Sequence, residues 1–498
     1  MQFRNLLTPI AFLAIVATIL FSERIVQPPA KDTRVHITYW EKWTSFEGDA
    51  IKDTVDYYNK SQDRIYVDLL TISSIEKKTL LAVAGGDPPD VAGLYGPNVA
   101  QYADDNAVMS LDDYCARNGM SRDQYIPIFW DMNVYHGHMY ALPTTPASTA
   151  LHYNKKLFAE AGLNPDAPPQ TLEEMDAMSQ KITTYTSDHK IDRAGFMPAD
   201  PGWWPWYWTY VFGGKLWDGK TKITANSPEN IRAFEWIQAY SKRFGAASLQ
   251  SFQSGLGNFS SPQNGFLDGE VAMQLQGVWM YNYISKYSPK MESPIRQWAA
   301  VPFPHPADRP DLAGTCVADE DILVIPRGAK HPDEAFEFVK FIESQKGMEM
   351  LCLKQRKFSP LRDVSKAFYA EHPNSYVKLF ADQTSGRNVI VPPKFGIWPE
   401  YLDAIRNTYE EVALEDVSKL TPQQAHAKVK QALDKLQARM QPKLDDYLEQ
   451  LQKRQQVAQG TDASEPVKPL AVKSQPAPAR KVSTEKMSTE KVLTKVAR

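Results

Sequence analysis

The sequence predicts an α/β fold with more than one lobe, and three observations lead to this class. The chain has 498 residues, which is too long for one ordinary domain and is typical of two lobes with tails. Strand patterns alternate with helical patterns from Val35 onward, as a largely parallel sheet requires. The hydrophobic fraction of 43% is sufficient for packed cores.

The first predicted elements follow the order β-α-β-α-β. Residues 34–40 alternate between apolar and polar and predict a strand, and helical spacing predicts a helix over 48–60. A strand over 65–70, a helix over 75–84 and a short strand over 91–94 follow. Ligands gather at the carboxyl ends of the strands in such sheets, so residues that follow these strands are candidates for binding.

Four later helices are predicted from their first residues. Thr171 to Glu174 forms a capping box, and Ser227 with Pro228 is a typical helix start. Pro332 opens a third helix, and Thr421 caps a fourth that continues to Met440. Pro442 is expected to kink or end this last helix, since proline lacks the backbone N–H group.

A short buried strand is predicted over 271–275, after the turn signal at Asp268 and Gly269. Gly277 is expected to let the backbone turn, which places Trp279 just past the end of the strand. A tryptophan in this position suits stacking on the apolar face of a ligand.

The two ends of the chain differ in composition from the rest. Arg4 precedes an apolar run over 6–21, so residues 1–22 are predicted to be a signal peptide or an uncleaved signal anchor. Either places the bulk of the chain in the periplasm or another extracytoplasmic compartment. Residues 456–498 are rich in Pro, Ala, Ser, Thr and Lys and are predicted to be a disordered tail.

Charge and motifs exclude several function classes. The net charge of −3 gives no general attraction to nucleic acid. No paired-acid signature, G-x-S-x-G elbow, P-loop or H-E-x-x-H motif occurs, so the chain is expected not to be an enzyme and to need no metal or cofactor. Cys115, Cys316 and Cys352 are predicted to be buried free thiols, with a bridge between the last two left open.

Several motifs together resemble family 1 extracellular solute-binding proteins, the periplasmic sugar-binding components of ABC importers. They are Phe266 to Trp279, Gly86-Asp-Pro-Pro-Asp-Val91, Tyr140-Ala-Leu-Pro143, Leu151 to Phe158 and Phe212-Gly-Gly214. The resemblance implies a two-lobed periplasmic-binding-protein fold of type II, with a ligand cleft between the lobes and several hinge crossovers. It places the first lobe at 33–146 plus 320–360 and the second at 147–319 plus 361–455. The hinges would lie near 143–147, 315–322 and 358–364.

Carbohydrate binding needs aromatic planes for the C–H faces of a sugar and polar groups for its hydroxyls. Positions after the predicted strands and positions implied by the resemblance together give nine candidate ligand-binding residues: Trp40, Glu41, Ser45, Asp87, Tyr95, Trp203, Trp206, Trp279 and Trp398. Lys42 is a further polar candidate. The acidic run 319–321 is interpreted as a hinge feature, with ligand contact as the alternative.

The resemblance implies a monomer that captures a sugar or oligosaccharide by lobe closure and delivers it to the permease subunits of an ABC transporter. Two alternatives keep the fold. The same aromatic and acidic residues could bind a polyamine or quaternary amine through cation–π contacts. The protein could also act as a ligand sensor.

Overall fold

The computed structural model describes residues 32–460, which all belong to one compact unit. The predicted signal segment 1–22 and the tail beyond Gly460 lie outside the described residues. Among the described helices, none combines the length and the apolar composition that a membrane span needs.

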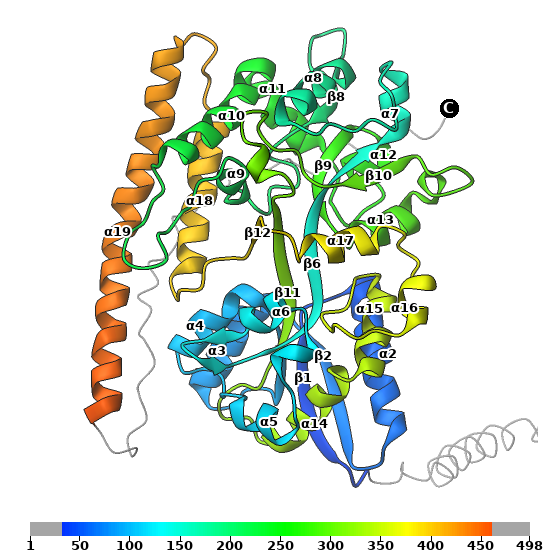
Figure 1. The fold of residues 1–498 in the computed structure, drawn as a ribbon, viewed down its shortest axis with the longest axis vertical. Helices are drawn as coiled ribbons and strands as arrows, with labels where there is room; N and C mark the ends of the chain where they lie inside the picture. The colour runs from blue at the N-terminus through cyan, green and yellow to red at the C-terminus, as the bar shows by residue number, and fades with distance from the viewer. Residues whose placement is uncertain (1–31, 461–498) are drawn as a thin grey trace, which may run out of the picture. The chain divides into compact units, whose positions relative to one another are not determined.

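The strands form a mixed sheet in the order β2-β1-β3-β11-β6-β9-β8-β7, with β10 paired to β6 and β12 paired to β11 (Figure 1). A separate hairpin joins β4 and β5. The strands are β1 Val35–Glu41, β2 Ile65–Thr71, β3 Val91–Tyr95, β4 Val134–Tyr135, β5 His138–Met139, β6 Leu142–Asn154, β7 Thr184–Tyr185, β8 Ile191–Phe196, β9 Val271–Gly277, β10 Trp298–Val301, β11 Cys316–Val324 and β12 Val389–Ile390.

The predicted β-α-β-α-β start is confirmed. Strand β1 pairs in parallel with β2 and with β3, and helices α2 and α3 connect them. The helices of this first part are α2 Ser45–Ser61, α3 Ile75–Gly85, α4 Val99–Asp104, α5 Asp112–Arg117 and α6 Pro127–Met132.

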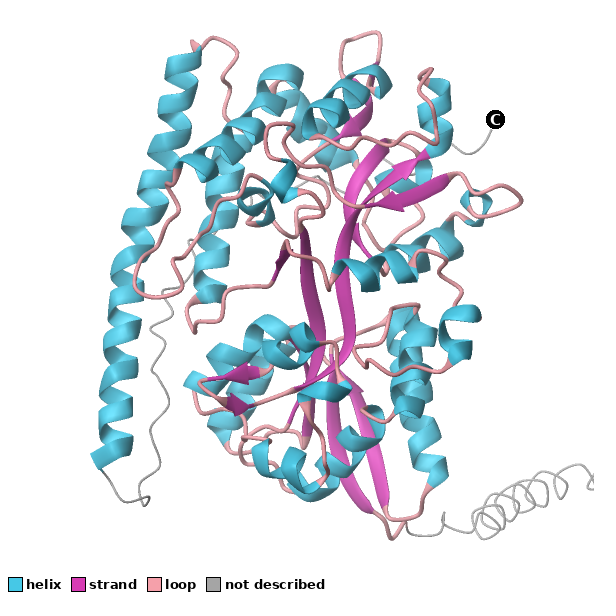
Figure 2. Cartoon of the chain, in the orientation of Figure 1, coloured by secondary structure: helices cyan, strands magenta, loops and turns pink. Residues whose placement is uncertain are grey.

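Two long strands run between the two lobes of the molecule (Figures 1 and 2). The first half of β6 pairs with β11, and its second half pairs with β9 and β10. Strand β11 in turn pairs with β3 at one end and with β12 at the other. The fold is therefore the two-lobed α/β fold of type II that the sequence predicts.

The remaining helices surround the strands and carry most of the second lobe. They are α7 Lys155–Glu160, α8 Leu172–Ile182, α9 Tyr207–Val211, α10 Pro228–Phe244, α11 Ala246–Gly255, α12 Gly265–Asp268, α13 Met280–Tyr287, α14 Pro332–Ile342, α15 Gln345–Gln355, α16 Lys366–Ala370, α17 Val377–Gln383, α18 Trp398–Ala413 and α19 Pro422–Gly460. The four predicted helix starts are confirmed: the Thr171 and Glu174 box caps α8, Ser227 caps α10, Pro332 opens α14, and Thr421 and Gln424 bond reciprocally before α19.

Separate hydrophobic cores lie at the two ends of the long strands. Ile37, Val91 and Phe336 belong to one core, whereas Leu151, Phe234 and Trp398 belong to another. The predicted lobe boundaries stay a prediction. One segment near a boundary lies with the other lobe than the prediction gave. Phe368, predicted to lie in the second lobe, packs into the first core because α16 follows α15 on the same side.

Helix α19 bears on two sequence predictions, the kink or end at Pro442 and the tail from residue 456. It continues through Pro442 without ending, and it extends to Gly460, past the predicted start of the tail at 456. Tyr447 explains part of this continuation, since it is buried and its hydroxyl donates to Oδ2 of Asp104 at 2.6 Å. Contacts of this kind offset the hydrogen bond that a proline removes from a helix.

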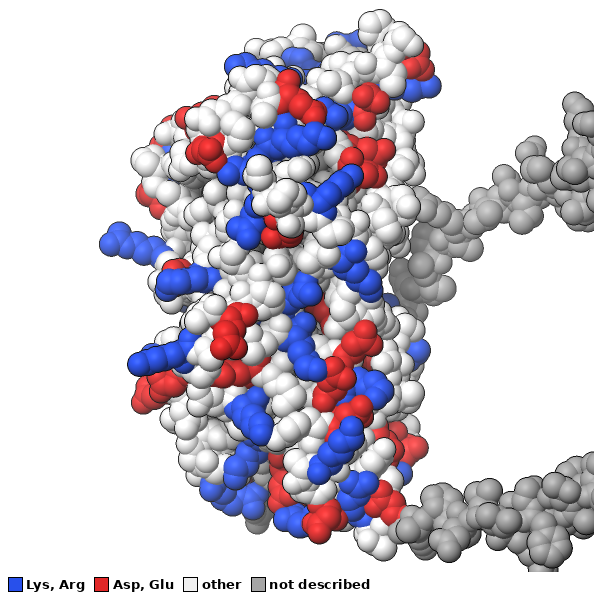
Figure 3. All heavy atoms as spheres, turned by 90° about the vertical axis from the view of Figure 1, so that its right-hand side faces the viewer, with Lys and Arg blue, Asp and Glu red and all other residues white. Residues whose placement is uncertain are grey.

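Lys and Arg side chains alternate with Asp and Glu over the face in Figure 3, and neither sign forms a continuous field there. Cys115, Cys316 and Cys352 are buried and free, as predicted.

Candidate functional site

A cavity of about 420 Å³ lies where the two lobes meet. Its walls come from segments that are far apart in the sequence, including α2, β3, β6, β11, α13 and the loops before α12 and α13. The lining residues are Trp43, Glu47, Tyr95, Thr145, Ala147, Trp203, Trp204, Phe259, Ser260, Trp279, Tyr283, Asp319, Glu320, Asp321 and Lys357.

One wall is aromatic and belongs to the second lobe. We define it as Trp203, Trp204, Phe259, Trp279 and Tyr283. The Trp279 ring lies 6.0 Å from that of Trp203 and 5.7 Å from that of Trp204, and Phe259 packs 4.5 Å from Trp203. Trp203 is 38% exposed, so a large apolar ring faces open space. Clustered rings of this kind can stack on the C–H faces of a ligand.

Gly277 gives Trp279 its place in this wall. A Cβ atom at Gly277 would lie 2.3 Å from the Trp279 ring, so only glycine lets the ring fold back against the end of β9. This corrects the predicted role of Gly277, because the residue is needed for close approach and has no positive φ.

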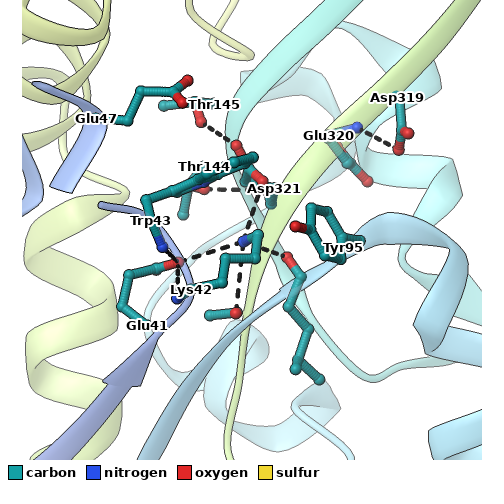
Figure 4. A network of polar contacts seen from close by, with 12 residues as sticks. Glu41, Lys42, Trp43, Glu47, Tyr95, Thr144, Thr145, Asp319, Glu320 and Asp321 are labelled. Atoms are coloured by element: carbon teal, nitrogen blue, oxygen red, sulfur yellow. Dashed lines mark hydrogen bonds and ion pairs between the residues drawn. The ribbon is translucent and has the colours of Figure 1, made fainter. Parts of the chain in front are cut away.

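The opposite wall is charged. It comes from the first lobe and from β11, and we define it as Glu47, Asp319, Glu320, Asp321 and Lys357. Asp321 is its centre (Figure 4): Oδ1 lies 3.1 Å from Nζ of Lys42, and Oδ2 lies 3.1 Å from Nζ of Lys357. Lys357 also pairs with Glu47 at 3.2 Å.

An irregularity in the strand pairing supports Asp321. Between Glu320 and Ile322 the register of β11 against β6 shifts, so Thr144 and Thr145 both face Asp321. Thr144 Oγ1 donates to the Asp321 carbonyl at 3.0 Å, and Thr145 Oγ1 donates to the Asp321 carboxylate at 2.7 Å.

The pKa of Asp321 is shifted in the opposite direction from those of Asp319 and Glu320. Burial alone would raise the pKa of Asp321, but the ammonium groups of Lys357 and Lys42 lower it to about 2. Burial raises the pKa of Asp319 to about 7 and that of Glu320 well above its ordinary value. The charged wall therefore holds one compensated carboxylate beside two acids that are costly to ionise.

Three of the nine predicted ligand-binding residues line the cavity: Tyr95, Trp203 and Trp279. Lys42, the further polar candidate, does not line it but reaches the charged wall from behind through Asp321. Asp319 to Asp321, interpreted from sequence as a hinge feature, line it as well.

The other six predicted residues do not line this cavity. Trp206 and Trp398 contact each other edge to face at 5.7 Å inside the second-lobe core, because α9 and α18 pack there. Asp87 is exposed and pairs with Lys330 on the surface at 2.8 Å. The remaining three are Trp40, which packs against a first-lobe core, Glu41, which is buried behind Lys42, and Ser45, which is exposed at the start of α2.

Sequence reasoning missed Trp43, Glu47, Phe259, Tyr283 and Lys357. Each comes from a separate segment, and only the tertiary fold brings them together. A second, polar cavity of about 320 Å³ shares Trp203 and Phe259 with the first. It contains Asp200, whose pKa burial raises to about 6 and whose Oδ2 accepts from Gln274. Asp200 lies just before Trp203 in the sequence, and this proximity was the signal that could have made it a candidate binding residue.

Residues 45–349, more than half of the chain, match the family of bacterial extracellular solute-binding proteins. The chain belongs to this family. An uncharacterized extracellular-binding protein of an ABC transporter from Pyrococcus horikoshii is 24% identical over 402 residues, which are 74% of this solute-binding protein and 83% of the relative. The maltotriose-binding protein of Pyrococcus abyssi is 22% identical over 206 residues, 41% of each chain.

Solved structures of similar fold cover most of the described residues. The solute-binding protein resembles CpMnBP1 with mannobiose bound at a TM-score of 0.70 and 25% identity, over 80% of this chain and 100% of that one. It resembles the sugar-binding protein MalE from Xanthomonas citri at a TM-score of 0.65 and 20% identity, over 86% and 100% of the two chains.

Proposed function

We propose that this solute-binding protein captures a sugar or oligosaccharide in the cavity between its lobes and delivers it to an ABC importer. The observation that carries the proposal is the aromatic wall facing a wall of carboxyl groups across a cavity of about 420 Å³. Aromatic rings stack on the apolar faces of a sugar, and carboxylates accept hydrogen bonds from its hydroxyls.

The relatives support the carbohydrate class. Mannobiose, mannotriose and maltotriose appear in the names of similar proteins, and these ligands have two or three sugar units. The smaller polar cavity that adjoins the aromatic wall at Trp203 and Phe259 extends the space available to one ligand. We therefore propose an oligosaccharide of at least two units as the ligand.

Contacts across the mouth of the cavity support capture by lobe closure. Phe46 at the start of α2 packs 5.0 Å from Tyr283 of α13, and Nζ of Lys286 lies 4.7 Å from the Phe46 ring. These residues join the two lobes beside the cavity, where closure over a ligand would tighten them. We further propose that the protein works as a monomer outside the cytoplasm, in contact with permease subunits and without catalytic activity.

A thermal-shift screen tests this function. Mannobiose, mannotriose, maltotriose and a polyamine are added to the protein at low and high salt. A ligand that binds the native state must raise the melting temperature. We expect at least one of the sugars to raise it. If none does while the polyamine does, the carbohydrate function is wrong.

A further inference from the structure

The charged wall has more carboxyl groups than cations. Four carboxyl groups line the cavity, from Glu47, Asp319, Glu320 and Asp321, whereas Lys357 is the one lysine in the lining. Lys357 is shared between Asp321 and Glu47, and Lys42, which reaches Asp321 from behind, is also 3.4 Å from Glu41. Among the described residues, neither Asp319 nor Glu320 has an ion-pair partner.

These two acidic side chains converge on one place. A Cβ atom at Gly96 would lie 3.2 Å from Cγ of Glu320 and 3.5 Å from Oδ1 of Asp319, so both pass the same glycine. The absence of a side chain at Gly96 leaves room for both. Figure 4 shows the Asp319 and Glu320 side chains next to each other on β11.

Glu320, which lines the cavity, has a carboxyl oxygen without a hydrogen-bond partner. Its side chain is 3% exposed, and Oε1 accepts from Nδ2 of Asn133 at 2.8 Å. Its other oxygen, Oε2, is buried and has no partner within the described structure. A buried carboxyl oxygen without a partner is costly, and a donor that arrives with a ligand would relieve that cost.

We propose that the ligand is a carbohydrate that carries a protonated amine, and that Asp319 and Glu320 bind its ammonium group. This inference rests on the proposed function, because the aromatic wall still holds the sugar rings. An ammonium group supplies the positive charge that the wall lacks, and its N–H groups can donate to Oε2 of Glu320 and to the Asp319 carboxylate. A neutral sugar would leave both acids without a counter-ion.

Three disaccharides of the same skeleton test the proposal: a glucosamine disaccharide, cellobiose and N,N′-diacetylchitobiose. They differ at C2, which bears an amine, a hydroxyl or an acetamide. Calorimetric titration at low salt should give an affinity for the amine about tenfold above that for cellobiose. The ratio should fall toward one at high salt, since ions screen the attraction. Equal or weaker binding of the amine, including no binding, overturns the proposal.

Two variants remove the charge and keep the shape. Asp319→Asn and Glu320→Gln retain the acceptors that bond to the Glu320 N–H and to Asn133. Each should lower the amine-to-cellobiose ratio about fivefold, because it removes a negative charge that only the amine requires. Asp188→Asn, on an exposed hairpin, is the matched control and should leave the ratio unchanged. An unchanged ratio in both cavity variants would also overturn the proposal.

The pH dependence provides a further readout. An ionised carboxylate is needed to bind an ammonium ion, so the ratio should rise from pH 5.5 to pH 7, and the rise should be smaller in Asp319→Asn, which keeps only Glu320. Asp321, Lys42, Lys357 and Glu320 surround Asp319, while Lys394, Asp319 and Glu343 surround Glu320. If neutral sugars raise the melting temperature in the screen but the amine has no advantage, this inference fails and the carbohydrate function stands.

Discussion

The two walls of the cavity are built on different physical principles. The aromatic wall gathers rings from three loops and helix α13, and its members contact each other, as in the 4.5 Å contact between Trp203 and Phe259. The charged wall sits on β11, a strand that both lobes share, and its centre Asp321 is held by two lysines and two threonines. The aromatic wall offers contact area to a ligand. The charged wall places ionisable groups where the two lobes join.

This difference implies separate consequences for stability and for binding. Removing a ring at the rim of a cavity loses ligand contact with little effect on the fold. Removing Asp321 leaves two lysines buried without their shared partner, which acts on the fold itself. The following predictions test that separation.

Asp321→Asn is expected to cause the largest loss in the free energy of unfolding. Lys42 and Lys357 have side chains that are 5% and 2% exposed, so both would be buried without their shared carboxylate. We expect a loss of about 3–5 kcal/mol in the free energy of unfolding, measured by urea denaturation. Asp308→Asn, which breaks an exposed pair with Arg232, is the control and should cost under about 1 kcal/mol. Similar losses in the two variants would contradict the account of the charged wall.

Acid should remove the stability that the ionised Asp321 carboxylate contributes. Lys357 and Lys42 hold the pKa of Asp321 at about 2, below its ordinary value of 3.8. The stability from this carboxylate is therefore present above about pH 4 and is lost as the pH falls through about 2. The loss is about 2 kcal/mol. Denaturation curves of the wild type and Asp321→Asn should converge over this range, and a constant difference down to pH 2 would exclude the mechanism.

Trp279→Ala should act on binding far more than on folding. The ring lies in the cavity lining and contacts Trp203 and Trp204, so its loss removes a stacking face for the ligand. We expect the Kd for a bound sugar to rise about thirtyfold, which corresponds to about 2 kcal/mol. Tyr185→Ala, at an exposed aromatic residue of β7, should leave the Kd unchanged. An equal change in Kd for the two variants would show that Trp279 does not contact the ligand.

Asp319→Asn should change the free energy of unfolding in the opposite direction from Asp321→Asn. Burial raises the pKa of Asp319 to about 7, so ionisation costs free energy as the pH rises from about 4 to about 7. Asp319→Asn should therefore stabilise the unliganded protein more at pH 8 than at pH 5. Thermal denaturation at the two pH values measures the difference. A destabilised variant at pH 8 would show that Asp319 supports the fold.

Local patterns predicted the elements but only part of the site. Alternation and spacing sufficed for β1, α2, β2, α3 and β3, because each is set by its own residues. Trp279 was predictable because a strand and a glycine precede it directly. Trp206 and Trp398 lie in the second-lobe core, because a tryptophan suits a core as well as a ligand and only the tertiary contact between the two rings decides between the two.

The charged wall was the hardest part to predict. Lys357 lies 36 residues beyond Asp321 in the sequence, and Glu47 is more than 270 residues before it, so no local spacing connects them. The acidic run 319–321 was visible, but its division into one compensated and two uncompensated carboxyl groups depends on which lysines the fold brings near. Pairing of that kind is a property of the tertiary structure.

The most direct test of the central claim is a calorimetric titration of the sugar that gives the largest thermal shift. It is made into the wild type, Trp279→Ala and Gly277→Ala, since a Cβ at Gly277 would displace the Trp279 ring. The account predicts saturable binding to the wild type and an affinity at least tenfold weaker in both variants. Unchanged affinity in both would contradict the claim that the cavity between the lobes, with its aromatic wall, holds the carbohydrate.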